Sequence, residues 1–243
     1  MTAADAFYAS ATVVVLVLSY LVGSIPFAYL IVKAVTGEDI TTHGTGNVGS
    51  MNVRRTTGSW AWFIAAVLGD GLKGLVPVLL AKALVGGFGL AWLATPVGVS
   101  AAAGGGYVSS ARWLLLVPQA AVLGCVVGHN YSVWMALIEH RFSRTGKGLA
   151  TGAGALLGYD WRYLVATLLL ALLVIAITRY MMAGQVAAAV GLPVTAIALR
   201  SPDWPFALLM GVFVYSAHHK RFVGLLKGQE PRLYINDRMG PRG

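Results

Sequence analysis

Long apolar stretches alternate with short polar segments along the 243-residue chain. A bilayer core requires about 20 apolar helical residues, or fewer for a helix packed inside a bundle. Residues 148–160 are the weakest candidate because the stretch is short and Gly152, Gly154 and Gly158 lower its apolar content. Residues 86–110 are also apolar, but their glycine and serine runs argue against a lipid-facing helix. We therefore predict an all-α polytopic membrane bundle with seven transmembrane spans, at about residues 8–34, 60–84, 113–138, 148–160, 162–180, 184–199 and 204–218.

Composition supports this prediction, since 57% of the residues are hydrophobic and 11% are charged. In a membrane protein the net charge of +9 is interpreted by position, so it does not indicate nucleic acid. The first apolar run lacks a basic flank and is expected to be a retained span. The single Cys125 excludes an intrachain disulfide and a cysteine metal cluster. No internal repeat or soluble segment stands out, so residues 1–243 are expected to form one membrane domain with a polar tail at 234–243.

The positions of the basic residues predict the orientation. With seven spans, 13 of the 18 basic residues fall on the face that carries the 36–59 loop, the 139–147 loop and the C-terminal tail. The positive-inside rule makes this face cytoplasmic and places the N-terminus outside. Thirteen residues make up this set: Lys33, Arg54, Arg55, Arg141, Arg144, Lys147, Arg179, Lys220, Arg221, Lys227, Arg232, Arg238 and Arg242.

Three polar clusters fall on this predicted face. The first is the glycine-rich run from His43 to Arg55, in which backbone N–H groups, hydroxyls, amides and two arginines favour an anion site over a flexible connector. The second, Arg141 to Thr151, places Gly146-Lys147-Gly148 at a predicted helix start, where the helix dipole favours an anion. It does not have Walker-loop spacing, and a basic flank of a span is the alternative. The third, His218 to Arg221, equally suits a topology signal or a contact with anionic lipid.

Other ionisable residues lie within predicted spans. Asp70 and Lys73 are one helical turn apart and suit either a structural ion pair or a catalytic role. His129 is interpreted as a buried, hydrogen-bonded histidine. The five histidines form no His-Glu-x-x-His pattern and have no thiol partners, so no metal or other cofactor is expected.

Several ordered motifs resemble the acyl-phosphate:glycerol-3-phosphate acyltransferase family, PlsY. The resemblance covers roughly residues 20–233, and the segments between the motifs match only in hydropathy. The motifs are Gly23 to Leu30; Gly44-Thr45-Gly46-Asn47-Val48-Gly49 with Asn52 and Arg55; Asp70 to Gly74; Gly128-His129; Gly146-Lys147-Gly148 with Ala150-Thr151; and His218 followed by Glu230.

The resemblance implies a bacterial plasma-membrane enzyme that transfers a fatty acyl group from acyl phosphate to the 1-hydroxyl of sn-glycerol 3-phosphate, in phospholipid synthesis. Lys147, His218 and Arg55 are then the expected catalytic residues, and Asp70, Lys73, His129 and Glu230 the supporting ones. The expected substrate-binding residues are Thr45, Gly44, Gly46, Asn47, Gly49, Asn52, Gly146, Gly148 and Arg221.

The chain departs from the family pattern at several positions. Thr45 replaces a serine and keeps the hydroxyl, whereas Thr145 stands where the family has glycine, and Ser50-Met51 precede Asn52 in place of Ala-Thr. Arg221 replaces an asparagine, exchanging a neutral amide for a donor-only cation. This change favours a more anionic or differently shaped phosphorylated alcohol as acceptor, which makes an acceptor-shifted paralogue an alternative. The 86–110 stretch exceeds the family's usual connection and has no assigned role.

Acyl phosphate carries a good leaving group, so positioning and charge neutralisation suffice for the transfer. The acceptor's own phosphate or His218 would take the hydroxyl proton, and the sequence leaves both open. The His-x₄-Asp motif of thioester-using acyltransferases is absent after all five histidines. A transporter for an anionic solute is the alternative from another class, but no pair of repeated broken helices supports it.

Overall fold

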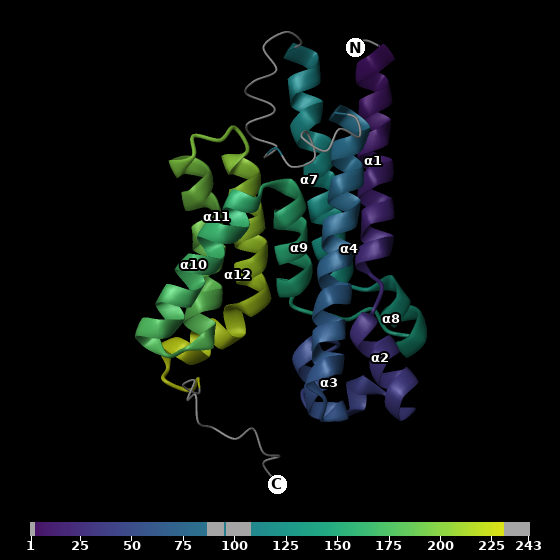
Figure 1. Cartoon of the computed structure of the whole chain (residues 1–243), viewed down its shortest axis with the longest axis vertical. Coiled ribbons are helices and arrows are strands. Elements are labelled where there is room, and N and C mark those ends of the chain that lie inside the picture. Colours follow the sequence, from purple (N-terminus) through teal and green to yellow (C-terminus); the bar gives the residue numbers. More distant parts are fainter. Residues whose placement is uncertain (1–2, 87–94, 96–107, 231–243) are drawn as a thin grey trace. The chain divides into compact units, whose positions relative to one another are not determined.

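The computed structural model describes residues 3–86, 95 and 108–230, almost entirely as helices (Figure 1). The chain divides into two compact units, residues 1–162 and 163–243, which are described separately below. The expectation of a single domain therefore stays a prediction. Most of the 86–110 stretch and the 234–243 tail lie outside the described residues.

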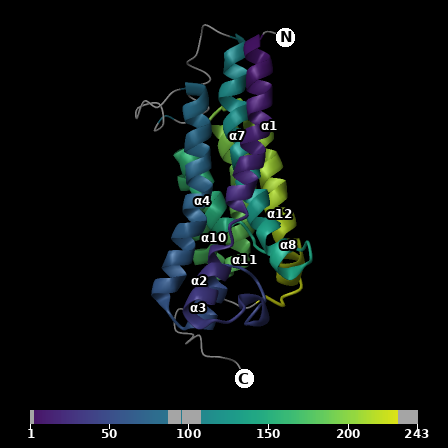
Figure 2. The same ribbon diagram turned by 90° about the vertical axis from the view of Figure 1, so that its right-hand side faces the viewer.

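The first unit is built around three long helices that run side by side. Figures 1 and 2 both show α1 beside α7, with α4 next to them, and α9 packs against α4 and α7. Its elements are α1 (Ala3–Gly23), α2 (Phe27–Thr36), η1 (Ile40–Thr42), α3 (Ser50–Thr57), α4 (Trp60–Gly86), α7 (Val108–Asn130), α8 (Val133–Glu139) and α9 (Leu149–Tyr159).

The second unit consists of α10 (Trp161–Thr178), whose first residues lie before the unit boundary, α11 (Met181–Ala198) and α12 (Trp204–Leu226). Helices α11 and α12 pack along each other. The hydroxyl of Tyr163 donates to Oδ1 of Asp203 at 2.6 Å, which ties the start of α10 to the residue before α12. The predicted span 204–218 ended at the cluster of residues 218–221. In the structure, helix α12 continues to Leu226, so this cluster lies within the helix.

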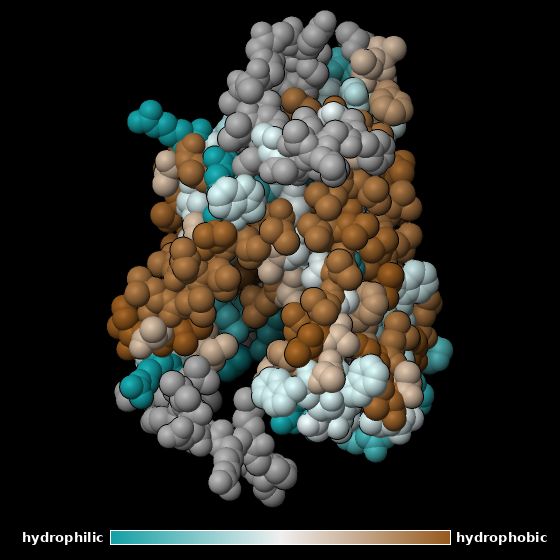
Figure 3. Space-filling view, in the orientation of Figure 1, coloured by the Kyte–Doolittle hydropathy of each residue, from teal (hydrophilic) through white to brown (hydrophobic). Residues whose placement is uncertain are grey.

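Five stretches among the described residues are long and apolar enough to cross a bilayer: Ala3–Thr36, Trp60–Gly86, Arg112–Glu139, Trp161–Thr178 and Met181–Ala198. The exposed sides of α4 and α10 are largely apolar in the space-filling view (Figure 3), as lipid-facing surfaces require. Helix α9 has 11 residues, which span about 16 Å. The all-helical class is thus confirmed, together with five candidate spans.

Two of the predicted spans are interrupted by short non-helical breaks. The stretch 8–34 divides into α1 and α2 at residues 24–26, where Pro26 supplies no N–H and precedes α2. The stretch 113–138 divides into α7 and α8 at Tyr131 and Ser132. Treating each apolar run as one uninterrupted helix would be wrong at both places, because hydropathy does not report a local change of backbone direction.

Glycines bring the backbones of the first unit into direct contact. A Cβ added to Gly154 of α9 would overlap the carbonyl oxygen of Gly71 in α4, and one added to Gly74 would overlap Thr151. A Cβ on Gly128 of α7 would overlap the carbonyl of Tyr20 in α1. Small residues at such crossings allow the close van der Waals packing that membrane helices use.

The contrast between two glycines of α9 gives a direct test of this packing. Gly154→Ala is expected to destabilise the protein by about 1–3 kcal/mol, because the added methyl group overpacks the α4 contact. Gly152→Ala is the matched control, since nothing lies within 4 Å of an added Cβ at that position. Thermal unfolding in detergent measures both variants, and equal midpoints for the two would contradict the close helix contact.

Candidate functional site

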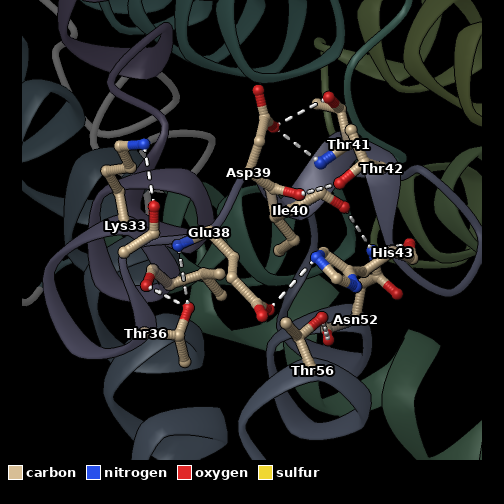
Figure 4. Close-up of polar contacts among 12 residues, drawn as sticks. Lys33, Thr36, Glu38, Asp39, Ile40, Thr41, Thr42, His43, Asn52 and Thr56 are labelled. Carbon is tan, nitrogen blue, oxygen red and sulfur yellow. Dashed lines mark hydrogen bonds and ion pairs between the residues drawn. The ribbon is translucent and has the colours of Figure 1, made fainter.

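The first loop, residues 37–49, is shaped by its own side chains (Figure 4). Oδ1 of Asp39 accepts hydrogen bonds from the backbone N–H of Thr41 at 2.9 Å and from its hydroxyl at 2.7 Å. Across the same turn, Oε2 of Glu38 lies 3.1 Å from Nε2 of His43. Ile40 is fully buried among apolar residues that include Val32 and Val53. The loop is therefore anchored on the apolar core at its first turn.

Asn52 supports this loop from α3. Its Nδ2 donates to the carbonyls of Ile40 and His43 at 3.1 and 2.9 Å, and its Oδ1 accepts from the N–H of Thr45 at 3.3 Å. The side chain is buried, with 2% of its surface exposed. In the structure Asn52 fixes the backbone of the loop, and the prediction that it binds substrate directly stays a prediction.

The exposed part of the loop gathers small residues beside a cation. Gly44 and Gly46 have φ values of 57° and 66°, a left-handed conformation that glycine adopts without strain. A Cβ placed on Gly44 would lie 3.5 Å from Cδ of Arg55, so the arginine stem runs alongside this glycine. Thr45 and Arg55 are both exposed. The hydroxyl of Thr45, the side chain of Arg55 and the left-handed turn at Gly44 and Gly46 therefore belong to one exposed surface.

The second loop, residues 140–148, is held by Thr145, which is buried. Its hydroxyl donates to the carbonyl of His129 at 2.9 Å and accepts from the N–H of Ser132 at 3.4 Å. Its backbone N–H donates to the carbonyl of Asn130, and its carbonyl accepts from the N–H of Val48 at 3.0 Å. The last bond joins the two predicted anion loops directly, and the bonds of the hydroxyl explain why a threonine suits position 145.

Beyond Thr145, the loop approaches the end of α7 and then begins α9. A Cβ on Gly146 would overlap the His129 ring, so only glycine fits against this imidazole. Gly148 has a φ of 74° and caps α9, and Lys147 lies partly buried between the two glycines. Lys147 thus precedes the cap of α9, and the free N–H groups at a helix start favour anions.

Arg144 adds a second cation to the loop. Its Nε donates to the carbonyl of Gly146 at 3.1 Å. Partial burial lowers the pKa of the Arg144 guanidinium from its ordinary value, and the nearby Tyr131 opposes this shift.

Behind the second loop, a buried chain of polar contacts reaches the α1–α2 break. Nδ1 of His129 lies 3.7 Å from Oδ1 of Asp70, whose carboxylate pairs with Nζ of Lys73 at 2.8 Å. Nζ of Lys73 also donates to the carbonyl of Ile25 at 2.7 Å. All three side chains are buried. Of the two roles proposed for Asp70 and Lys73, the structure shows the ion pair.

Ser132 forms a second connection between the second loop and the α1–α2 break. Its hydroxyl donates to the carbonyl of Ser24 at 2.5 Å and accepts from the N–H of Met135, so it caps α8 as well. Sequence reasoning did not identify this residue. The available signal was a serine three residues before Met135 at the start of an apolar helix, a common N-cap pattern.

The remaining predicted residues belong mainly to the second unit. His218 is buried in α12. Arg221 follows one helical turn later and forms a two-point ion pair with Glu230. Asn47 and Gly49 remain with the first loop, where a Cβ on Gly49 would lie 3.5 Å from Nδ2 of Asn47. Within the described residues, no group of three or more His, Cys, Asp or Glu side chains is placed to hold a metal ion.

These features describe an all-helical protein with five candidate membrane spans, in which a backbone hydrogen bond joins two cationic, glycine-rich loops. The family model described as glycerol-3-phosphate acyltransferase matches residues 13–228. The chain belongs to this family, and the resemblance seen in the motifs is confirmed.

Similar proteins from several bacteria carry the same description, "Glycerol-3-phosphate acyltransferase". The relative from Desulforudis audaxviator is 36% identical over 92% of this chain and 96% of its own length. A relative from Thermus thermophilus is 35% identical over the same shares. The relative from Thermosynechococcus vestitus is 33% identical over 89% of this chain and 92% of its own.

The fold also matches a solved structure. The crystal structure of PlsY, described as an integral membrane glycerol 3-phosphate acyltransferase in its glycerol 3-phosphate form, aligns with a TM-score of 0.69. The match covers 92% of this chain and 96% of that one, at 24% identity, and shows a shared fold.

Thr145 offers a test of how the second loop is held. Thr145→Val removes the hydroxyl and leaves the carbonyl of His129 and the N–H of Ser132 without this partner, at an expected cost of about 1–3 kcal/mol. The loop should then detach more often, so trypsin should cleave faster after Arg141 and Arg144. Thr145→Ser keeps the hydroxyl and serves as the control. Equal cleavage rates for the valine and serine variants would show that the hydroxyl does not hold the loop.

Proposed function

We propose that this chain transfers a fatty acyl group from acyl phosphate to the 1-hydroxyl of sn-glycerol 3-phosphate, giving lysophosphatidate and inorganic phosphate. The observation that carries the proposal is the hydrogen bond from Val48 to Thr145, which joins two cationic, glycine-rich loops into one site. Such a site suits a reaction in which two phosphates must lie close together. Family membership supports the same reaction.

Each loop supplies hydrogen-bond donors and positive charge. In the first loop, the hydroxyl of Thr45 and the guanidinium of Arg55 hold the phosphate of the acceptor, and Gly44 and Gly46 allow the backbone to approach it. In the second, Lys147 also holds the phosphate of the acceptor, and Gly146, Gly148 and the first N–H groups of α9 allow the backbone to approach the phosphate of the donor. His218 and Arg221 stay predicted site residues on the motif resemblance alone.

The chemistry then needs little beyond orientation and charge. The acceptor hydroxyl oxygen attacks the acyl carbon, the bond from that carbon to the phosphate oxygen breaks, and phosphate leaves with the bonding electron pair. The hydroxyl proton passes to the acceptor's own phosphate or to His218. Arg55 and Lys147 offset the repulsion between two anions, the main electrostatic obstacle. No covalent acyl-enzyme is required.

Purified protein tests the reaction directly. Acyl phosphate and sn-glycerol 3-phosphate should yield lysophosphatidate and phosphate, and Lys147→Ala or Arg55→Ala should lower the rate at least about a hundredfold because each removes a charge from the transition state. Arg141→Ala is the matched control, since it removes an exposed cation from the same loop as Lys147. Absence of lysophosphatidate with every acyl chain length would overturn the assignment.

For the membrane arrangement, we propose seven spans in a bacterial plasma membrane, with the N-terminus outside and both loops on the cytoplasmic side. Five long candidate spans support this proposal, with α9 and α12 as the remaining two. The short α9 is compatible with a span because it packs against α4 and α7 and does not have to contact lipid along its whole length.

Reporter fusions in a bacterial host test this topology. A C-terminal green fluorescent protein should be fluorescent, and alkaline phosphatase fused at the N-terminus should be active, because each folds on its own side of the membrane. The opposite pattern would reverse the orientation. Two fusions reporting the same side would require an even number of spans.

A further inference from the structure

The turn that joins α11 to α12 (Figure 1) carries an open pocket of about 540 Å³. Two of its lining residues are polar and the others are apolar; they are Ile197, Arg200, Ser201, Pro202 and Trp204. All of them belong to the second unit. They lie outside both anion loops and outside every motif of the family resemblance.

Arg200 is held at the end of α11 by backbone hydrogen bonds. Its N–H donates to the carbonyl of Ile197, and the N–H of Ser201 donates to the carbonyl of Ala196, both at 2.9 Å. This pairing ends the helix with Arg200 at a φ of 51°, a left-handed position that glycine usually occupies. Arg200 is exposed, and its guanidinium forms no hydrogen bond or ion pair with the described residues. The pocket therefore has an available cation.

Ser201 contributes a buried hydroxyl to the lining. Only 6% of the residue is exposed, and its Oγ has no hydrogen-bond partner in the part of the chain that the structure describes. A buried hydroxyl costs free energy unless it is hydrogen-bonded, so an unpaired one beside a pocket points to a bound acceptor.

The first turn of α12 begins at the same pocket, with Trp204. The preceding Asp203 makes no side-chain cap, so the positive end of the helix dipole is left for an anion. The carboxylate of Asp203 is buried, and its Oδ1 accepts from the hydroxyl of Tyr163 in α10. Asp203 is not among the lining residues.

The apolar part of the lining suits a bilayer surface. Helix α11 is one of the five candidate spans, so its end reaches the boundary between hydrocarbon and headgroups. Ile197 and Trp204 are 61% and 48% exposed, and tryptophan favours the headgroup level of a membrane. A cation and a hydroxyl beside an apolar wall match the polar–apolar boundary of a phospholipid.

We propose that this pocket binds the phosphate group of a membrane phospholipid. The guanidinium of Arg200 pairs with the phosphate oxygens, the hydroxyl of Ser201 donates to one of them, and Trp204 contacts the glycerol and the first acyl carbons. Inorganic phosphate offers the same oxygens but nothing for the apolar wall, so a lipid fits this lining better. The inference goes beyond the proposed function and does not depend on it.

Native mass spectrometry of the purified full-length protein in detergent measures dissociation constants for two probes. Dioleoyl phosphatidylglycerol carries the phosphate, and dioleoylglycerol has the same acyl chains and glycerol without it. The wild type should bind phosphatidylglycerol more tightly. Arg200→Gln should weaken that binding about tenfold, the scale of a lost hydrogen bond to a charged group.

Ser201→Ala is the second variant. It should weaken binding of phosphatidylglycerol about threefold. It should not lower the unfolding midpoint of the lipid-free protein, because the hydroxyl has no partner to lose. Arg179→Gln is the matched control, since Arg179 is likewise exposed and follows the end of α10 at a φ of 60°. It should leave the dissociation constant unchanged.

Three results would overturn the proposal. Equal dissociation constants for Arg200→Gln and Arg179→Gln would show that Arg200 only offsets the dipole of α11. Equally tight binding of the two probes to the wild type would show that the phosphate is not recognised. Displacement of phosphatidylglycerol by millimolar inorganic phosphate would identify free phosphate, and not a lipid, as the ligand.

Discussion

The break between α1 and α2 is the constraint on which the site depends. Two carbonyls at this break, those of Ser24 and Ile25, receive their hydrogen bonds from side chains of other elements, Ser132 and Lys73. Within a bilayer an unsatisfied carbonyl costs several kcal/mol, so Ser132 and Lys73, together with the N–H of Phe27 that also donates to Ile25, stabilise this break. Both side chains are also connected to the second loop. The N–H of Ser132 donates to the hydroxyl of Thr145, and Lys73 pairs with Asp70, which lies beside His129. The partners that satisfy the break thereby position the loop.

Close helix packing sets the distances in this arrangement. Gly71 and Gly154 bring α4 against α9, and Gly128 brings α7 against α1, with backbone meeting backbone in both pairs. Asp70 and Lys73 come from α4, and His129 comes from α7, so their contacts depend on the α4–α7 crossing. The anion loops then need few contacts of their own. Asn52 supports the first loop, Thr145 supports the second, and the bond from Val48 joins them.

Much of this could be predicted from the sequence, because membrane-length apolar runs and dense clusters of glycine and cations are local signals. The helical class and the residues of both loops were found in this way. The breaks at residues 24–26 and 131–132 were not predicted, because the spans were drawn from hydropathy and the local signals at Pro26 and Ser132 were not used. The roles of Thr145 and Ser132 depend on partners far away in the chain. The ion pair of Arg221 with Glu230 likewise depends on Gly228, where the chain turns back after α12.

The central claim is that the two loops form one preformed phosphate site. Amide hydrogen exchange over Gly44–Gly49 and Thr145–Gly148 measures this directly, in the purified protein with and without sn-glycerol 3-phosphate. We expect slow exchange at Val48 and Thr145 before any ligand is added, because both N–H groups are already bonded. Added ligand should then slow exchange in both loops together. Fast exchange at both amides in the free protein, or protection confined to one loop, would contradict the account.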